Sequence, residues 1–86
     1  MNNQTEFRKK KEVILFIFEY SCVMCGLVDL SNHVHHINGS HQDNDVYNLA
    51  VLCDYCHKIV HKSHIVLRLV YSDSQIVLLE RLKSLW

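Results

Sequence analysis

Apolar residues are concentrated towards both ends of the chain and in two short runs between them. Near the N-terminus, VILFIF follows the charged segment EFRKKKE, and near the C-terminus apolar residues recur at every third position from Ile76 to Leu85. The C-terminal spacing is typical of an amphipathic helix, which Ser72 or Asp73 would cap. The N-terminal run contains many strand-forming residues, but we interpret it as the buried face of a helix. We therefore predict flanking helices at about 6–20 and 74–85.

The middle of the chain has the pattern of short strands. HVHHI (33–37) ends at the turn dipeptide Asn38-Gly39, and NLAVLC (48–53) is a second apolar run that follows a polar loop. The segment YCHKIVHK is predicted to be a helix with Asp54 as its N-cap. We therefore expect the order strand, loop, strand, helix. The segment HIVLRLVYS after this helix alternates weakly, which predicts a further short strand.

The length of 86 residues suits one small domain, which we place over 1–86 with its core at 22–62. Domains of this size bury a limited share of their unfolded surface and often need a staple such as a metal ion. The hydrophobic fraction of 49% is ordinary for a globular protein and argues against disorder. The apolar runs are too short for a membrane span, and the N-terminal run lacks the cleavage site of a secretion signal. We therefore expect a cytoplasmic protein.

The formal net charge is zero with the histidines neutral, so no global field attracts nucleic acid. Any such binding would depend on local clusters of charge, and the densest basic cluster is Arg8, Lys9, Lys10 and Lys11. Two interpretations of this cluster stay open. It is either the solvated start of a helix or a contact for phosphates that would make binding sensitive to salt.

The four cysteines form two CxxC pairs, Cys22 with Cys25 and Cys53 with Cys56, and Gly26 follows the first pair. In a secreted protein they would indicate two disulfides, whereas in a cytoplasmic protein they indicate four thiolates around one zinc ion. A single pair would be compatible with a redox site, but the second pair favours zinc. Four sulfurs close the coordination shell, so this zinc would be structural. Its binding would stabilise the fold by on the order of 10 kcal/mol.

The remaining ligand-capable side chains are histidines. His57 and His61 lie four residues apart on the predicted helix, so they share a face and could bind one metal, although such a pair is often only surface polarity. His35 could bring a third imidazole from the first strand. His35 and His36 are neighbours in that strand and should point to opposite faces, so they are poor co-ligands. We interpret one as a metal ligand and the other as a catalytic base.

Three further histidines are given no role in this interpretation. His33 shares a face with His35 and could be a ligand, but a partly exposed strand histidine is the simpler account. His41 lies in the polar loop and His64 follows the predicted helix. We expect both to lie outside the site.

The segments CVMCG and VHHINGSHQDNDVYNLAVLCDYCHKIVH together resemble the HNH endonucleases, and in particular the subtype with a zinc site built from two CxxC pairs. The likeness extends from about Cys22 to His61. It includes, in the order typical of the family, a histidine doublet, an asparagine before a leucine, LCxxCH and a further histidine. The resemblance implies an α+β fold, namely a small zinc-stabilised ββα-metal (His-Me finger) fold with flanking N- and C-terminal helices.

The resemblance also implies roles for single residues. His36 corresponds to the general base that activates water, and Asn48 to the central asparagine that braces the loop. His57 corresponds to the metal ligand on the helix, and His35 stands where many members have a ligating carboxylate. With His61, this ligand set is similar to that of the colicin-type nucleases. The catalytic metal would be Zn²⁺, Mn²⁺, Ni²⁺, Co²⁺ or Mg²⁺, and imidazole ligands favour the first four. The loop lacks the double glycine of many members, so its shape is not implied.

The activity implied by the resemblance is metal-dependent hydrolysis of DNA phosphodiester bonds, which leaves 5′ phosphates. One alternative is a non-catalytic, zinc-stabilised nucleic-acid-binding module, which would not need His36, Asn48 and the helix histidines together. Another is an interaction adaptor that uses the C-terminal helix. The expected partner is DNA, with no membrane; a second copy of the chain or a larger phage or host protein is a further possibility, and phage and mobile elements are common contexts for such proteins. The basic residues expected at the nucleic acid are Arg8, Lys9, Lys10, Lys11, Lys58 and Lys62.

Overall fold

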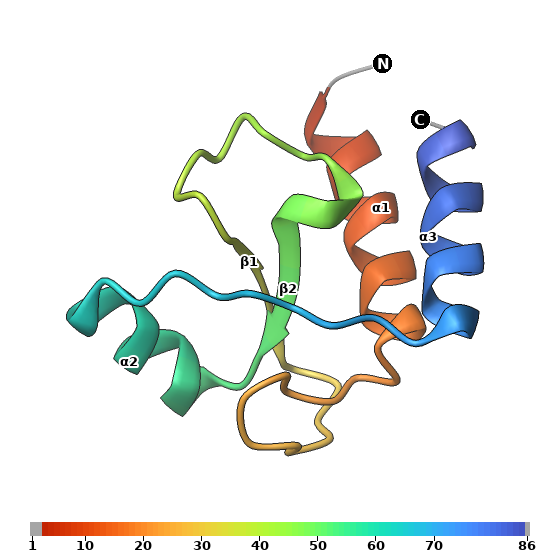
Figure 1. Ribbon diagram of the computed structural model, residues 1–86. Helices are drawn as coiled ribbons and strands as arrows, with labels where there is room; N and C mark the ends of the chain where they lie inside the picture. Colours follow the sequence, from red (N-terminus) through yellow and green to blue (C-terminus); the bar gives the residue numbers. More distant parts are fainter. Residues whose placement is uncertain (1–2, 86) are drawn as a thin grey trace.

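The computed structural model describes residues 3–85, which form a small α+β fold, as the sequence predicts (Figure 1). The two strands make an antiparallel hairpin, and a helix follows the second strand directly. No helix within residues 3–85 is both long and apolar enough to cross a bilayer. The elements are α1 (Asn3–Ile17), β1 (His33–His36), the 3₁₀ turn η1 (Val46–Asn48), β2 (Leu49–Leu52), α2 (Asp54–Ser63) and α3 (Asp73–Leu85).

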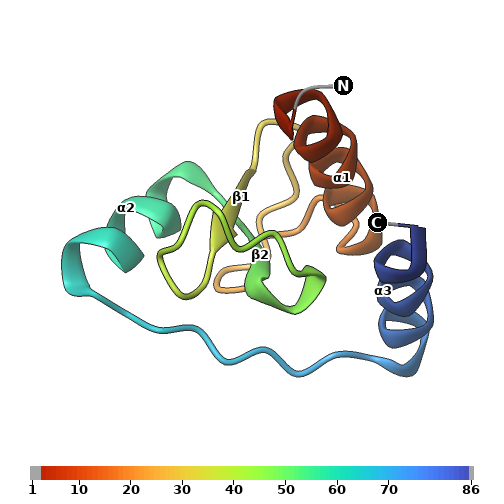
Figure 2. The ribbon, with the colours of Figure 1, turned by 90° about the horizontal axis from the view of Figure 1, so that it is seen from above.

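The hairpin separates two layers of the molecule. Figures 1 and 2 show α1 and α3 side by side on one side of the hairpin and α2 on the other. Paired side chains of an antiparallel ladder share a face, and successive side chains alternate between faces. Every residue of β2 is buried, because the strand serves both layers. The paired residues are His33 with Leu52, Val34 with Val51, His35 with Ala50 and His36 with Leu49.

The larger core lies between α1, α3 and one face of the hairpin. It explains why VILFIF is helical despite its composition: burial of its apolar side chains against β2 and α3 outweighs local strand propensity. A second, smaller cluster forms around the cysteines on the other face, with Leu52 and Val60. The buried residues of the larger core are Ile14, Leu15, Ile17, Phe18, Val46, Leu49, Val51, Leu79 and Leu82.

The flanking helices differ from the sequence prediction at their ends. Helix α1 spans Asn3–Ile17 instead of 6–20, and the chain turns away where Glu19 and Tyr20 adopt left-handed φ values of 57° and 58°. Ser72 caps α3: its Oγ accepts from the N–H of Gln75 at 3.2 Å, and the Gln75 side-chain oxygen accepts from the N–H of Ser72 at 2.9 Å. This reciprocal pair is a capping box.

The connection between α2 and α3 is not a strand, so the prediction of a strand after α2 was wrong. Residues 64–72 run as an extended segment that crosses over β2 instead of running beside it (Figure 1). Its weak alternation has another cause. Leu67 and Leu69 pack against the two cores, whereas Val66 and Val70 are exposed, so the segment is an apolar strap held by side-chain packing.

Two candidate metal centres

The four thiols meet because two turns of the backbone are tied together. In the first turn the N–H of Gly26 donates to the carbonyl of Cys22 at 2.8 Å, and Gly26 has a φ of 80°, which glycine adopts without strain. The N–H of Val23 donates to the carbonyl of Val51 at 2.9 Å. This bond holds the first turn against the end of β2, where the second CxxC pair begins.

The spacing of the sulfurs fits a tetrahedral zinc site. All four Sγ atoms lie within 4.8 Å of one another, and the Sγ atoms of Cys25 and Cys53 are 3.7 Å apart. A disulfide requires about 2.05 Å, whereas Zn–S bonds of 2.3 Å place two sulfurs of a tetrahedron roughly 3.8 Å apart. All four cysteines are free. The cluster therefore suits a structural zinc ion, in agreement with the sequence, and does not hold disulfides.

The protonation of the thiols also points to a cation. Burial, together with the neighbouring sulfurs of the other cysteines, raises the pKa of Cys56 to about 12. Burial also raises the pKa of Cys22, but backbone N–H groups that donate to its sulfur more than compensate and bring its pKa to about 6. Four thiolates this close would repel one another unless a divalent ion neutralised them, and zinc binding would deprotonate them.

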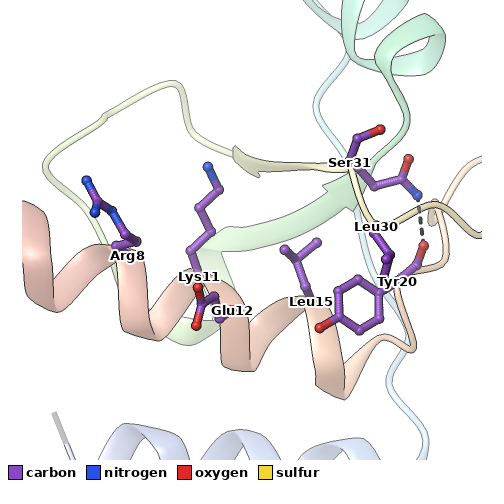
Figure 3. Close-up of a pocket in the computed structure, with 8 residues that line it drawn as sticks. Arg8, Lys11, Glu12, Leu15, Tyr20, Leu30 and Ser31 are labelled. Atoms are coloured by element: carbon purple, nitrogen blue, oxygen red, sulfur yellow. Dashed lines mark hydrogen bonds between the residues drawn. The ribbon is translucent and has the colours of Figure 1, made fainter.

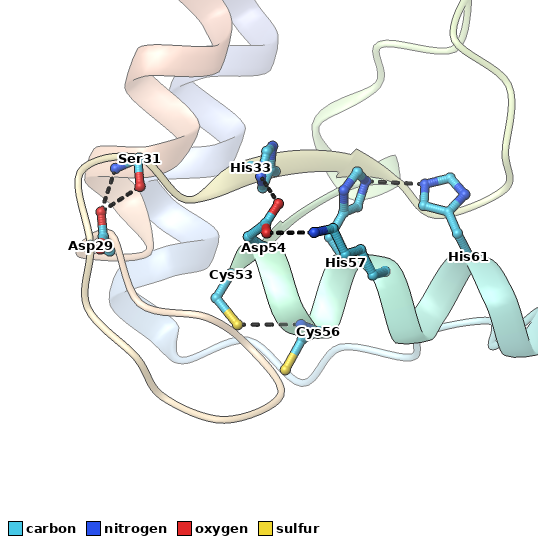
Figure 4. Close-up of polar contacts among 9 residues, drawn as sticks. Asp29, Ser31, His33, Cys53, Asp54, Cys56, His57 and His61 are labelled. Atoms are coloured by element: carbon cyan, nitrogen blue, oxygen red, sulfur yellow. Dashed lines mark hydrogen bonds and ion pairs between the residues drawn. The ribbon is translucent and has the colours of Figure 1, made fainter.

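A second cluster of three imidazoles lies on the α2 face of the hairpin. His35 projects from β1 towards His57 and His61, which share one face of α2, and one ring nitrogen of each lies within 4.8 Å of the others. The Nε2 atoms of His57 and His61 are 3.0 Å apart (Figure 4). Nitrogens bound at 2.0–2.1 Å to a common ion would be separated by roughly 3.0–3.4 Å. The donor set therefore fits a divalent ion.

The environment of this imidazole cluster favours the neutral form of His35 and His57. Burial, together with the nearby rings of His57 and His61, lowers the pKa of His35 to about 4. Burial also lowers the pKa of His57, and the rings of His61 and His33 add to that shift. A neutral imidazole offers a lone pair to a metal, so at neutral pH His35 and His57 are in the form that binds one.

His33 lies beside this cluster without joining it. Its ring stacks on His57, with centroids 4.8 Å apart and an interplanar angle of 17°. Its Nε2 lies 3.2 Å from Oδ1 of Asp54, whose other oxygen is 3.0 Å from Nζ of Lys58 (Figure 4). The sequence predicted Asp54 as the N-cap of α2, but Asp54 is the first residue of the helix. Cys53 is the N-cap, because its Sγ accepts the N–H of Cys56 at 3.4 Å.

His36 points to the opposite face of the hairpin, towards α1, as expected for the neighbour of His35. Its ring lies beside Phe7, with centroids 5.4 Å apart, and its Nε2 is 2.8 Å from Oδ1 of Asn44. An amide oxygen can only accept, so this contact requires the proton on Nε2 and leaves the lone pair on Nδ1. The group that orients the His36 ring is thus a side-chain amide.

Asn44 is itself held by α1. The ammonium group of Lys10 donates to the backbone carbonyl of Asn44, and burial lowers the pKa of Lys10 despite the opposing charges of Asp43 and Asp45. This contact joins residues that are 34 positions apart in the chain. Local spacing contains no signal for such a pair, so sequence reasoning missed Asn44 and treated Lys10 as part of a basic cluster that is either solvated or in contact with phosphates.

Asn48 closes the loop that carries Asn44. Its Oδ1 accepts from the N–H of Asn38 at 3.0 Å, and its Nδ2 donates to Oδ1 of Asn38 at 3.0 Å and to the carbonyl of Asp43 at 2.8 Å. One buried amide therefore ties the first and last residues of the segment 38–43 together. Because Asn44 follows immediately, this arrangement also sets the position of the His36 ring.

A cavity of about 200 Å³ at the edge of β1 brings the two faces of the hairpin together. The three clustered imidazoles line it from one face and His36 lines it from the other. His41, which sequence reasoning placed outside the site, also lines this cavity, and its ring centroid is 5.2 Å from that of His36. His64 is exposed and ends α2 with a left-handed φ of 52°. The metal-suited cluster and His36 therefore open into one space.

The basic residues expected at DNA lie in different surroundings. Lys58 is paired with Asp54, whereas Lys62 on α2 and Lys9 on α1 are exposed. Lys10 is bound to Asn44 as described above. Arg8 and Lys11 line a groove along α1. The six side chains therefore differ in what they contact.

Comparison with known proteins assigns neither a family nor a function to the chain. No family model, curated protein or solved structure matches the chain. The functional interpretation depends on the two clusters and on their place in the hairpin–helix arrangement.

Proposed function

We propose that this protein is an HNH-type endonuclease that hydrolyses phosphodiester bonds in DNA with the help of a divalent metal ion. The observation that carries the proposal is the shared cavity. Three imidazoles suited to a divalent ion and a fourth imidazole with a free Nδ1 open into the same space of about 200 Å³. The hairpin followed by a helix, with four thiols at their junction, also supports the resemblance to HNH nucleases.

His35, His57 and His61 would hold the catalytic ion. An ion bound there supplies Lewis-acid stabilisation for the charge that develops on the phosphoryl and leaving oxygens. The donor set contains no carboxylate, so zinc, cobalt, nickel or manganese suits it better than magnesium. The thiol cluster contributes indirectly. Because His57 follows Cys56 in the chain, fixing the start of α2 also fixes the first imidazole on that helix.

His36 would act as the general base through Nδ1. Hydrolysis forms a bond from the water oxygen to phosphorus and breaks the bond from phosphorus to the 3′ oxygen, while Nδ1 takes the proton from the water. A positioned base of this kind typically contributes ~10²–10⁴ in rate. Asn44 holds the ring through Nε2, Lys10 holds Asn44, and Asn48 holds the loop. These three are positioning residues.

The test is nicking of a supercoiled plasmid by protein loaded with one equivalent of zinc, with and without added manganese or cobalt, beside a count of metal ions per chain. The proposal predicts two bound ions and nicking that depends on the metal. His36→Ala should lose the activity, whereas His64→Asn should keep it, because His64 does not line the cavity and asparagine tolerates its left-handed backbone. One bound ion without nicking would contradict the proposal and favour a nucleic-acid-binding module.

A further inference from the structure

A second hollow runs along α1, between that helix and the residues that lead into β1 (Figure 3). Its volume is about 600 Å³, which is larger than the cavity at the histidines, and the function proposed above makes no use of it. Figure 3 shows the side chains of Arg8 and Lys11 projecting from the same side of α1. The charged and apolar side chains that line it are Arg8, Lys11, Glu12, Leu15, Tyr20 and Leu30.

We propose that this groove binds the sugar–phosphate backbone of the DNA strand where it leaves the histidine cavity, with Arg8 and Lys11 as the phosphate ligands. The identity of the strand as DNA rests on the function proposed above. The groove adds a binding site for the phosphates next to the one that is cleaved.

The charges along α1 support the assignment of Arg8 and Lys11 as the phosphate ligands. Arg8 and Lys11 are three residues apart, so they lie one above the other on the helix surface. Among the side chains that the structure describes, neither takes part in an ion pair. Lys10 is occupied by Asn44, and Lys9 is exposed but does not line the groove. The basic cluster therefore presents two cations to the groove, not four.

The groove and the histidine cavity share their two walls. Phe7 of α1 lines the cavity and the next residue, Arg8, lines the groove. On the opposite wall Val34 lines the cavity, and Ser31 and Asn32 line the groove. From Phe7 to Leu15 a helix rises roughly 12 Å, and one DNA strand carries a phosphate about every 3.4 Å along the duplex axis. This length accommodates about three phosphates.

The remaining lining defines what the groove can contact. Leu15, Leu30 and the ring of Tyr20 form an apolar side that suits the carbon face of a sugar or base. The amide of Asn32 donates to the carbonyls of Tyr20 and Leu27, both at 2.8 Å, so it holds the wall in place. Glu12 brings a negative charge to the lining and opposes phosphate binding. Binding should therefore be modest and should improve when that charge is removed.

The test is the affinity of a fluorescently labelled 16-base-pair DNA duplex, measured by anisotropy at several salt concentrations. All variants are zinc-loaded and carry His36→Ala, so that the DNA stays intact, and circular dichroism checks their fold. The decisive pair is Lys11→Gln against Lys9→Gln, because these substitutions remove the same charge from nearly opposite sides of one turn of the helix. Arg8→Gln and Glu12→Gln complete the set.

Each lost phosphate contact should reduce the slope of log affinity against log salt by about 0.9. We expect this reduction for Lys11→Gln and Arg8→Gln, a roughly tenfold weaker affinity when both are combined, and little change for Lys9→Gln. Glu12→Gln should tighten binding. Equal effects of Lys9→Gln and Lys11→Gln, or no binding by the parent protein, would overturn the inference. Failure of the nuclease proposal gives a different result from failure of this inference. A protein that binds DNA through this groove but never nicks plasmid would contradict the nuclease proposal and support the groove as a DNA-binding site.

Discussion

The thiol cluster and the imidazole cluster lie on the same face of the hairpin, yet they are built for different purposes. Three of the thiols are buried, with exposed fractions of 2% for Cys22, 3% for Cys53 and 5% for Cys56. Backbone hydrogen bonds join the turns that carry them, and four sulfurs leave no position open for another ligand. The imidazoles instead provide three donors at the wall of a cavity, and His61 is exposed.

The imidazole cluster depends structurally on the thiol cluster, and the reverse does not hold. The thiol cluster joins the first turn, the end of β2 and the start of α2, so the positions of His57 and His61 depend on it. Among residues 3–85, no comparable backbone hydrogen bond makes the thiols depend on the imidazoles. Loss of a cysteine should therefore abolish both centres, whereas loss of a histidine should remove only one.

The largest expected effect is the loss of a zinc-binding thiolate. Cys53→Ser should unfold the domain, because the zinc contributes on the order of 10 kcal/mol and a chain of this length has little else to replace it. Circular dichroism and the zinc content of the purified protein check this result. Met24→Ala, which changes an exposed residue between two of the cysteines, is the matched control and should stay folded. A folded Cys53→Ser protein would contradict the dependence of the imidazole cluster on the thiol cluster.

The next effect concerns chemistry without loss of structure. His36→Ala should reduce cleavage by ~10²–10⁴ while the fold and both bound ions are retained, because this ring packs beside Phe7 of α1 and is not one of the three clustered ligands. Cleavage rates and metal content, measured on the same preparation, check the prediction. If the variant instead lost an ion, the roles of His35 and His36 would have to be exchanged.

A smaller effect is expected at Asn48, which belongs to neither cluster. Its side chain makes three hydrogen bonds that close the loop, and each is worth about 0.5–1.5 kcal/mol. Asn48→Ala should therefore lower the free energy of unfolding by about 2–4 kcal/mol and slow cleavage, because Asn44 is no longer held against His36. Denaturant unfolding and cleavage assays measure the two effects. A destabilised protein with full activity would show that the loop does not position the base.

The pH dependence of stability should separate the two centres further. The pKa of His35 is about 4 in the folded chain, below its ordinary value of 6.5, so the unfolded chain takes up a proton first as the pH falls. The stability from this group is present above pH 6.5 and is lost as the pH decreases towards 4. Thermal midpoints of the wild type and His35→Gln between pH 7.5 and 4.5 measure this loss. One equivalent of zinc per chain is supplied, so that the thiol cluster is filled and the imidazole cluster stays empty in both proteins, and parallel curves would contradict the shift.

The sequence predicts the thiol cluster more completely than the site around His36, and the reason is distance along the chain. The two CxxC pairs and the pair His57 and His61 follow local spacings of turns and helices, which the folded chain preserves. His35 and His36 likewise point to opposite faces of the hairpin, because neighbouring residues of a strand alternate between its faces.

The contacts that orient His36 have no such local rule. Lys10 meets Asn44 only because α1 packs beside the loop, and His41 reaches the cavity only because Asn48 folds the loop back. The strap at 64–72 alternates like a strand but crosses over β2, so its backbone has no partner strand to pair with. These features are products of tertiary packing, which periodicity alone does not contain.

The most direct test of the two-centre account is the number of zinc or cobalt ions bound per chain, in the wild type and in His57→Gln. The account predicts two ions in the wild type and one in the variant, with the fold of the variant unchanged. One ion in both proteins would contradict the account, since the imidazole cluster would then hold no metal and only the thiol cluster would remain as a metal centre.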